Sequence, residues 1–255
     1  ELFRSVKAGN GRVEIALTDG GTLSAAQVND LSVAGTANCY VVSAPGTYVF
    51  NARVRGNGAG EGVGFEPAIE MADGMTADWL WTDSEGLVSG VALDTTSGDI
   101  FLTVGEGRGN ALVALMQDGK VVWSWHVWVT DAPQTMTYGN GTVFMDRNLG
   151  AVGTTAGGTD AYGMYYQWGR KDPFYGGEKT ETSANAFLEA KNGTVVNPAY
   201  PALDWAFSKS ATTTDGAAAN PMTFYNDKVG TGYNWLASPN ATLWGCLLYT
   251  SRAHE

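Results

Sequence analysis

One histidine stands in a run of residues that could position it for chemistry. His126 lies in the segment VVWSWHVW, where strand alternation sends Ser124, His126 and Trp128 to one side and Trp123 and Trp125 to the other. A catalytic histidine needs a nucleophile or an orienting carboxylate beside it, and no GxSxG or HExxH frame surrounds this one. We therefore interpret His126 as a strand residue half buried among tryptophans, and we assign no catalytic residue.

Carboxylate pairs would be the other route to catalysis, because glycoside hydrolysis needs two acids across a cleft. The acids that flank tryptophans or arginines are Asp78, Asp83, Glu85, Asp146 and Asp172. Acids at turns or beside arginines commonly cap turns or form ion pairs, and no motif ties any two of these together. The sequence therefore favours a protein that is not an enzyme.

Metal and cofactor chemistry finds no support in the spacing of potential ligands. Cys39 and Cys246 match no metal-ligand pattern, and a disulfide between them is open on parity alone. The loop at residues 215–220 lacks the spacing of an EF-hand. We expect no metal and no cofactor, while a calcium ion stays open.

Aromatic side chains offer a third chemistry, the stacking of sugar rings. Apolar sugar faces stack on flat rings, and nearby Asn, Asp and Arg side chains can bond the hydroxyls. The candidate ligand-binding residues are Tyr165, Trp168, Trp205 and Trp235. The alternative is that such rings fill a core, as strand alternation predicts for Trp168 and its neighbours, and the sequence leaves both interpretations open.

The elements that must position these residues are short strands, because apolar residues alternate along most of the chain. Gln117-Asp118-Gly119-Lys120 is typical of a tight hairpin. We predict strands at residues 12–17, 37–43, 47–55, 78–82, 87–93, 100–104, 111–116 and 121–129. This density of strands indicates an immunoglobulin-like β-sandwich over residues 31–131, preceded by the end of another domain and a linker at residues 1–30.

A second, mainly β domain is predicted over residues 132–245, after a boundary marked by Asp131 and Pro133. Within it we predict strands at residues 142–146 and 161–168, and a helix at residues 183–191 that Ser183 could cap. Residues 192–219 are rich in Thr, Ala, Pro and Asn and are predicted to form a loop-like insertion. The predicted fold class is mostly β, with α+β character in the second domain.

Charge and hydropathy disfavour several kinds of partner. The formal net charge is −11, so the surface repels phosphate backbones and we expect no nucleic-acid partner. Hydrophobic residues make up 44% of the chain and charged residues 16%, which is typical of a globular protein. No apolar run approaches the length of a transmembrane helix.

Four ordered segments resemble a recurrent arrangement in Bacteroidota surface proteins. They are ANCYVVSAPGTYVFNARVRGNG (37–58), VVWSWHVWVTD (121–131), VFMDRNLGA (143–151) and YGMYYQWGRKDPF (162–174). In those proteins the arrangement accompanies fimbrillin-type and tip-like subunits. The second half is similar to the Fibrobacter succinogenes major paralogous domain, whose later motifs match ANPMTFY (219–225), YNWLAS (233–238) and LWG (243–245). No catalytic residue is carried over from this family.

The resemblance implies an exported protein at the cell surface, outer membrane-associated or extracellular, that is anchored as a lipoprotein or built into a fimbria. It implies a structural or adhesive role, with other surface or fimbrial subunits, or host or dietary glycans, as partners. A carbohydrate-binding module is the alternative function. The family's second domain is akin to lectin-like folds, which is an analogy of fold alone.

The end of the chain departs from the family pattern. The family continues after position 245 with a Cys-Pro segment and a Trp-Arg-x-Pro motif that this chain lacks, so we expect a truncated second domain. Residues 246–255, CLLYTSRAHE, resemble the translated end of a sequencing adapter, and we interpret them as an artefact.

Overall fold

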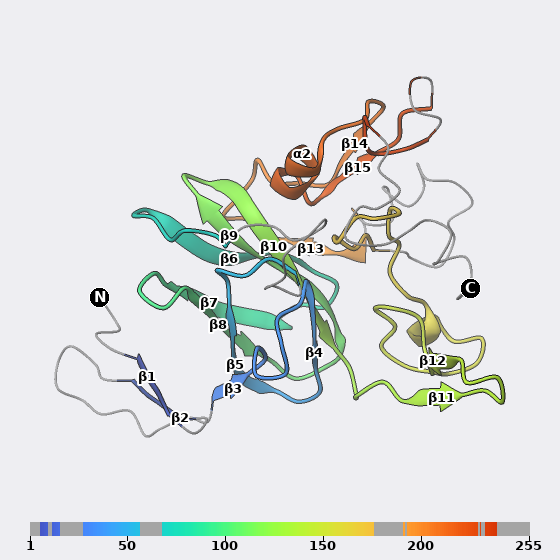
Figure 1. Ribbon diagram of the computed structural model, residues 1–255, viewed down its shortest axis with the longest axis horizontal. Coiled ribbons are helices and arrows are strands. Elements are labelled where there is room, and N and C mark those ends of the chain that lie inside the picture. The colour runs from blue at the N-terminus through green and yellow to red at the C-terminus, as the bar shows by residue number, and fades with distance from the viewer. Residues whose placement is uncertain are drawn as a thin grey trace.

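The computed structural model describes residues 6–9, 12–15, 28–56, 68–175, 191, 193–228, 230 and 233–238. Over these residues the protein is mainly β, which confirms the prediction from alternation. Two larger sheets stack on each other, a hairpin projects from one end, and short elements lie over the outer side of one sheet (Figure 1). The immunoglobulin-like comparison stays a prediction.

The first of the two larger sheets has four strands in the order β3-β5-β8-β7. Their bounds are Val28–Asp30 for β3, Gly46–Asn51 for β5, Asp99–Val104 for β8 and Val88–Asp94 for β7. β3 pairs with β5 in parallel, and the other pairs are antiparallel. β3 belongs to this sheet although it lies just before the predicted domain boundary at residue 31. Further upstream, β1 (Val6–Gly9) and β2 (Arg12–Ile15) pair with each other.

The second sheet has five strands in the order β13-β6-β9-β10-β4. Their bounds are Val195–Val196 for β13, Met75–Thr82 for β6, Gly109–Gln117 for β9, Lys120–Val129 for β10 and Cys39–Val42 for β4. β4 pairs with β10 in parallel, and the remaining pairs are antiparallel. The predicted tight turn between β9 and β10 is confirmed, since Asp118 and Gly119 have φ of 51° and 73°, the left-handed pair that such a turn requires.

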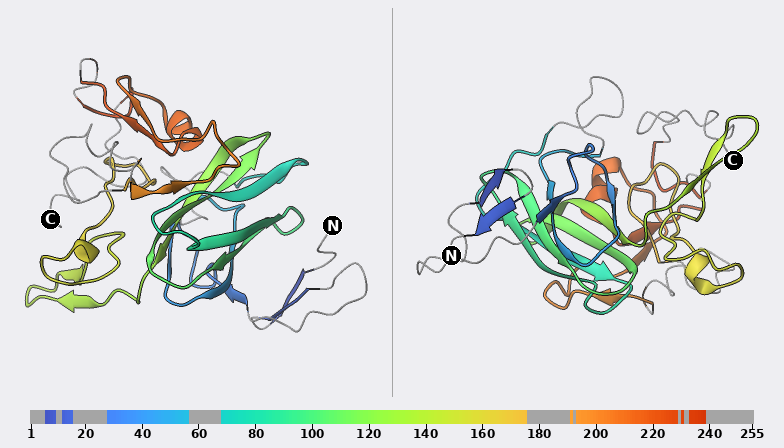
Figure 2. Two further views of the ribbon diagram at one scale, coloured as in Figure 1. Left: turned by 180° about the vertical axis from the view of Figure 1, so that it is seen from behind. Right: turned by 90° about the horizontal axis from the view of Figure 1, so that it is seen from below.

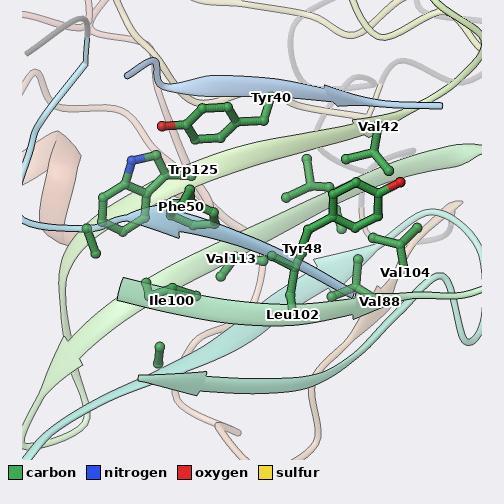
Figure 3. Close-up of a cluster of buried hydrophobic side chains, with 14 of the residues drawn as sticks. Tyr40, Val42, Tyr48, Phe50, Val88, Ile100, Leu102, Val104, Val113 and Trp125 are labelled. Carbon is green, nitrogen blue, oxygen red and sulfur yellow. The ribbon is translucent and has the colours of Figure 1, made fainter. Parts of the chain in front are cut away.

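Apolar side chains on the facing sides of the two sheets form the main core (Figure 3). Phe50 and Leu102 come from the four-stranded sheet and Val113 and Trp125 from the five-stranded one, and all four are fully buried. The rings of Phe50 and Trp125 lie 5.2 Å apart between centroids. A buried side chain of this size contributes about 1.5–3 kcal/mol. Alternation that points such side chains inward is therefore what holds the sheets together.

The outer face of the five-stranded sheet is buried as well. Alternate residues of β9 face opposite ways, so that Val113 belongs to the main core and Leu112 to a second one. The second half of the chain supplies Phe174, Trp205 and Met222 to this second core, and its strand β13 pairs with β6. The residues after 131 therefore share a core and a sheet with those before it (Figure 2).

The second half consists of short elements joined by turns. They are β11 (Thr135–Thr137), β12 (Val143–Met145), η1 (Thr159–Ala161), β14 (Ala206–Ser208), α2 (Thr214–Ala219) and β15 (Thr223–Tyr225). β11 pairs with β12, near the predicted strand at 142–146, and β14 pairs with β15.

Two sequence predictions for this half are wrong. Residues 161–168 do not form a strand: η1 ends at Ala161, and only Tyr165 makes a β-bridge, to Phe174. Alternation occurs there without a neighbouring strand to pair with. Residues 192–219 are not a plain loop, because they contain β13, β14 and α2, which Thr213 caps by accepting from the Gly216 N–H. The predicted helix at 183–191, except for its last position, and the tail at 246–255 lie outside the described residues.

Candidate functional site

The four aromatic residues predicted to stack on sugars occupy two different environments. Tyr165 and Trp168 are 41% and 51% exposed, whereas Trp205 and Trp235 are 3% and 4% exposed. The indole N–H of Trp235 donates to the backbone oxygen of Trp168 at 2.6 Å, so the buried ring anchors the backbone of the exposed one. Trp205 and Trp235 are therefore structural, and the predicted set of four does not form one binding face.

Trp205 belongs to the core on the outer face of the five-stranded sheet. Its ring centroid lies 5.4 Å from that of Trp81 and 5.7 Å from that of Phe174. Its Nε1–H donates to Oγ1 of Thr194 at 2.7 Å. This hydrogen bond gives a partner to the one polar atom of the ring, which burial would otherwise leave without one. Trp205 therefore fills a core, which is the alternative to sugar stacking that the sequence left open.

The fold brings His126 into contact with two residues that lie far from it in the sequence. β4 and β10 pair in parallel with Cys39 opposite His126, and the Cys39 Sγ lies 3.2 Å from Nδ1 of the ring. On the other side, Nε2 lies 2.8 Å from Oδ1 of Asn110 in β9. His126 is 1% exposed. The predicted half-buried position is thus corrected to full burial, because the second half of the chain covers this face.

The orientation of Asn110 decides the tautomer of the histidine. Its Nδ2 donates to Oδ2 of Asp83 at 2.8 Å and to the Gly150 backbone oxygen at 3.0 Å. Its backbone N–H donates to Oδ1 of the same carboxylate at 2.6 Å. With both amide hydrogens used, Oδ1 must face His126 as an acceptor. Nε2 of the histidine therefore carries the proton, and Nδ1 accepts from the Cys39 thiol.

Burial keeps the thiol and the imidazole neutral. Loss of hydration lowers the pKa of His126 to about 3 and raises the pKa of Cys39 to about 12. Burial also raises the pKa of Asp83 to about 6, against the hydrogen bonds from Asn110. At neutral pH the cysteine is thus a thiol, whereas activated catalytic cysteines have a lowered pKa.

Sequence reasoning missed this line of groups because its members come from three different strands. Positions 39, 110 and 126 meet only through the parallel pairing of β4 with β10 and the antiparallel pairing of β10 with β9. No local frame around any one of them signals the contact. The pattern VVWSWHVW did predict correctly that His126 and Ser124 share the face opposite Trp125.

A second polar cluster lies on the same face of β10. Lys171 Nζ donates to the Ser124 backbone oxygen at 2.9 Å, to Ser124 Oγ at 2.6 Å and to Asp172 Oδ1 at 2.5 Å. Ser124 Oγ donates to the same carboxylate oxygen at 2.7 Å. Burial lowers the pKa of Lys171, against the attraction of Asp172. Since Ser124 is 1% exposed, the cluster holds the second half onto the sheet and offers no open nucleophile.

Four of the five candidate acids are engaged one by one, and the fifth, Glu85, is exposed to solvent. Asp78 accepts from the Tyr200 hydroxyl at 3.1 Å, and Asp83 and Asp172 are held as described above. Asp146 forms a two-point contact with Arg147, with distances of 2.8 and 3.0 Å. Within the described part of the chain, no group of three or more His, Cys, Asp or Glu side chains could hold a metal ion.

A hairpin formed by β11 and β12 is the most apolar exposed feature in the described part of the chain. Its large apolar side chains are 39–56% exposed: Met136, Tyr138, Val143, Phe144 and Met145. The segment from residue 132 to residue 145 contains no charged residue. In both Figure 1 and Figure 2 the hairpin extends away from the two stacked sheets.

The base of the hairpin is held by an ionic clamp. Arg147, which follows β12, bonds Asp146 at two points and donates to Thr130 Oγ1 at 2.9 Å. Its Nη2 also lies 3.5 Å from an oxygen of Asp131. The hydrogen bonds to Asp146 raise the pKa of Arg147 and lower the pKa of that carboxyl. The clamp ties the end of β12 to the end of β10, so the hairpin projects in a defined direction.

Neither a protein-family model nor a curated protein matches the chain. Among the described residues, no helix has the length and hydropathy that a membrane span requires.

Proposed function

We propose that the chain is a non-enzymatic structural or adhesive module of an exported, cell-surface or fimbria-associated protein, and that it docks onto a neighbouring protein subunit through the hairpin β11–β12. The exposed apolar side chains of this hairpin are the observation that carries the proposal. The likeness of four ordered segments to Bacteroidota surface proteins supports the location. The net charge of −11 supports a partner other than nucleic acid.

The physics of an isolated hairpin supports a docking role. A two-stranded sheet is marginal on its own in water, and an unpaired strand edge is a template for a further strand. Among the described strands, β11 and β12 pair only with each other. A strand or an apolar face from a second protein would cover the exposed side chains and satisfy the free edge. The absence of charge between residues 132 and 145 removes the usual barrier to such pairing.

The burial of the polar clusters supports a role without catalysis. Ser124 and His126 on the sheet, and Asp172 from the covering half, have catalytic potential, but each of these residues is only 1% exposed. A substrate would have to displace the covering half of the chain to reach them. Buried polar networks of this kind commonly specify how two layers pack.

A glycan-binding module is the second candidate function, and the exposure of Tyr165 and Trp168 is the observation in its favour. Both rings remain open to solvent on the covering half of the chain. A glycan array with the wild-type protein and the Trp168→Ala variant separates the two proposals. Subunit docking predicts no specific glycan signal, whereas the glycan module predicts a signal that Trp168→Ala removes and that hairpin substitutions leave intact.

Photocrosslinking in the cells that produce the protein tests the docking proposal. Phe144 would be replaced by p-benzoylphenylalanine, and the matched control would carry the same group at Val33, which is 81% exposed and lies in the first half of the chain. We expect ultraviolet light to link position 144 to one discrete exported protein and to give no such adduct from position 33. Identical adduct patterns from the two positions, or no adduct from position 144, would contradict the proposal.

A further inference from the structure

All seven methionines of the chain lie among the described residues, and two of them differ from the rest in their exposure. Met136 is 52% exposed and Met145 is 39% exposed, whereas Met116 and Met222 are 0% and 3% exposed. The other three are partly buried against the two cores: Met71, Met75 and Met164. Both exposed thioethers belong to the hairpin β11–β12.

The register of the hairpin puts one methionine on each of its faces. Met136 lies opposite Phe144 in the antiparallel pair, so these two side chains share a face. Met145 follows Phe144 directly and therefore points to the other face. A partner that covers either face of the hairpin must bury a thioether.

We propose that Met136 and Met145 form an oxidation site, at which a hydroperoxide converts the thioethers to sulfoxides and thereby weakens the docking of the hairpin. The oxidation site itself rests on the exposure of the two side chains, while its effect on docking rests on the proposed function. Methionine sulfoxide is reduced again by enzymes specific for each epimer, so the modification is reversible.

The oxidation step balances with one molecule of hydroperoxide for each methionine. The sulfur forms a bond to the outer oxygen of the hydroperoxide, and the bond between the two oxygens breaks. The hydroperoxide proton moves through solvent to the departing oxygen, which leaves as water or an alcohol. The sulfur is oxidised to a sulfoxide and the hydroperoxide is reduced. No titratable side chain takes part, and the segment from residue 132 to residue 145 contains no charged residue.

The sulfoxide acts on docking through its polarity. Oxidation turns a flexible apolar side chain into a polar one, whose oxygen is a strong hydrogen-bond acceptor. An apolar partner face would bury this oxygen without a donor, which should weaken docking by at least about tenfold. Met136 and Met145 belong to neither core, so their oxidation should leave the folding of the two sheets unchanged.

Peptide mapping of the isolated protein during treatment with hydrogen peroxide tests the site. We expect Met136 and Met145 to gain oxygen at least about tenfold faster than Met116 and Met222. In the protein unfolded by urea, the four rates should agree within about twofold. Equal rates in the folded protein, or faster oxidation of the buried pair, would overturn the site.

Photocrosslinking of oxidised and untreated protein tests the effect on docking. p-Benzoylphenylalanine would replace Val143, which is 56% exposed and lies opposite Thr137 rather than Met136. Purified protein would be oxidised, freed of peroxide and irradiated with the envelope fraction of the producing cells. We expect oxidation to lower the yield of the discrete adduct at least about tenfold.

The matched control carries Met136→Leu and Met145→Leu together, which replace the thioethers by side chains of similar volume that do not form sulfoxides. Compared with its own untreated sample, this variant should change its adduct yield less than about twofold on treatment. The same loss in the variant as in the wild type, or equal yields from oxidised and untreated wild type, would overturn the effect on docking.

Two further outcomes separate this inference from the proposals on which it depends. An unchanged midpoint of urea unfolding after oxidation is expected, and a lowered midpoint would overturn the local effect. No adduct from untreated protein would overturn the docking proposal, and with it the effect of oxidation on docking. The peptide map decides the oxidation site in either case.

Discussion

At His126, the hydration lost on folding sets the protonation state more strongly than any neighbouring dipole does. The hydrogen bonds of the ring, to Asn110 and from Cys39 and the Tyr166 hydroxyl, suit its neutral form. Burial also lowers the pKa of Lys171 although Asp172 is in contact with it. At the scale of single residues, the identity of a side chain says less about its chemistry than the depth at which it lies.

The neutral histidine should make the protein sensitive to acid. The unfolded chain takes up a proton near pH 6.5, but folded His126 stays neutral down to about pH 3, so this residue destabilises the fold as pH falls through that window. Between pH 6.5 and pH 5, the free energy of unfolding of the wild type should fall by about 2 kcal/mol more than that of His126→Gln. Denaturant titrations at the two pH values measure this difference.

The titration of Asp83 also changes stability with pH, so the effect of His126 must be measured as a difference between the wild type and His126→Gln. Its folded pKa of about 6 lies above its ordinary value, so protonation of Asp83 stabilises the fold as pH falls from 6 towards 4 and opposes the effect of His126. This contribution is common to both proteins and cancels in the difference. Equal acid dependence of wild type and variant would show that His126 is charged in the folded protein.

At the scale of elements, alternation and turn residues predicted seven of the nine strands of the two sheets to within a few residues, and they missed the short strands β3 and β13. The strand predicted at 121–129 is β10, and Asp118-Gly119 forms the predicted turn. The run from residue 111 to residue 116 is apolar at every position, a signal of burial on both faces that alternation alone does not use. The cover over that outer face, and the meeting of Cys39 with His126, depend on non-local pairing, which local patterns do not encode.

The difference between local pattern and non-local packing also explains why the aromatic candidates lie in two different environments. Trp168 and Trp205 are the same residue type, but Trp168 lies in a turn on the surface whereas Trp205 packs between Trp81 and Phe174. We expect Trp205→Ala to cost about 3–5 kcal/mol of stability, and Trp168→Ala to change it by no more than about 0.5 kcal/mol. Urea unfolding of the two variants beside the wild type checks this. A similar cost for both would mean that the covering half does not share a core with β6.

At the scale of the whole molecule, the two halves of the chain form one packed unit from which the hairpin β11–β12 projects. β13 extends the five-stranded sheet, and the Lys171–Asp172 pair and Trp205 fasten the cover to its face. Arg147 then joins the end of β12 to Asp146 and Thr130, at the point where the hairpin leaves the sheets. A rigid body that holds an uncharged apolar hairpin away from itself is the physical basis for the proposed docking role.

Hydrogen–deuterium exchange on the hairpin tests this claim most directly. The backbone amides of Thr135–Thr137 and Val143–Met145 would be followed in the isolated protein and in the protein recovered, still assembled, from the envelope of the cells that make it. We predict that assembly slows exchange in these two strands by at least about tenfold, while the already protected strands β9 and β10 do not change. Equal exchange of the hairpin in the two states would contradict the account.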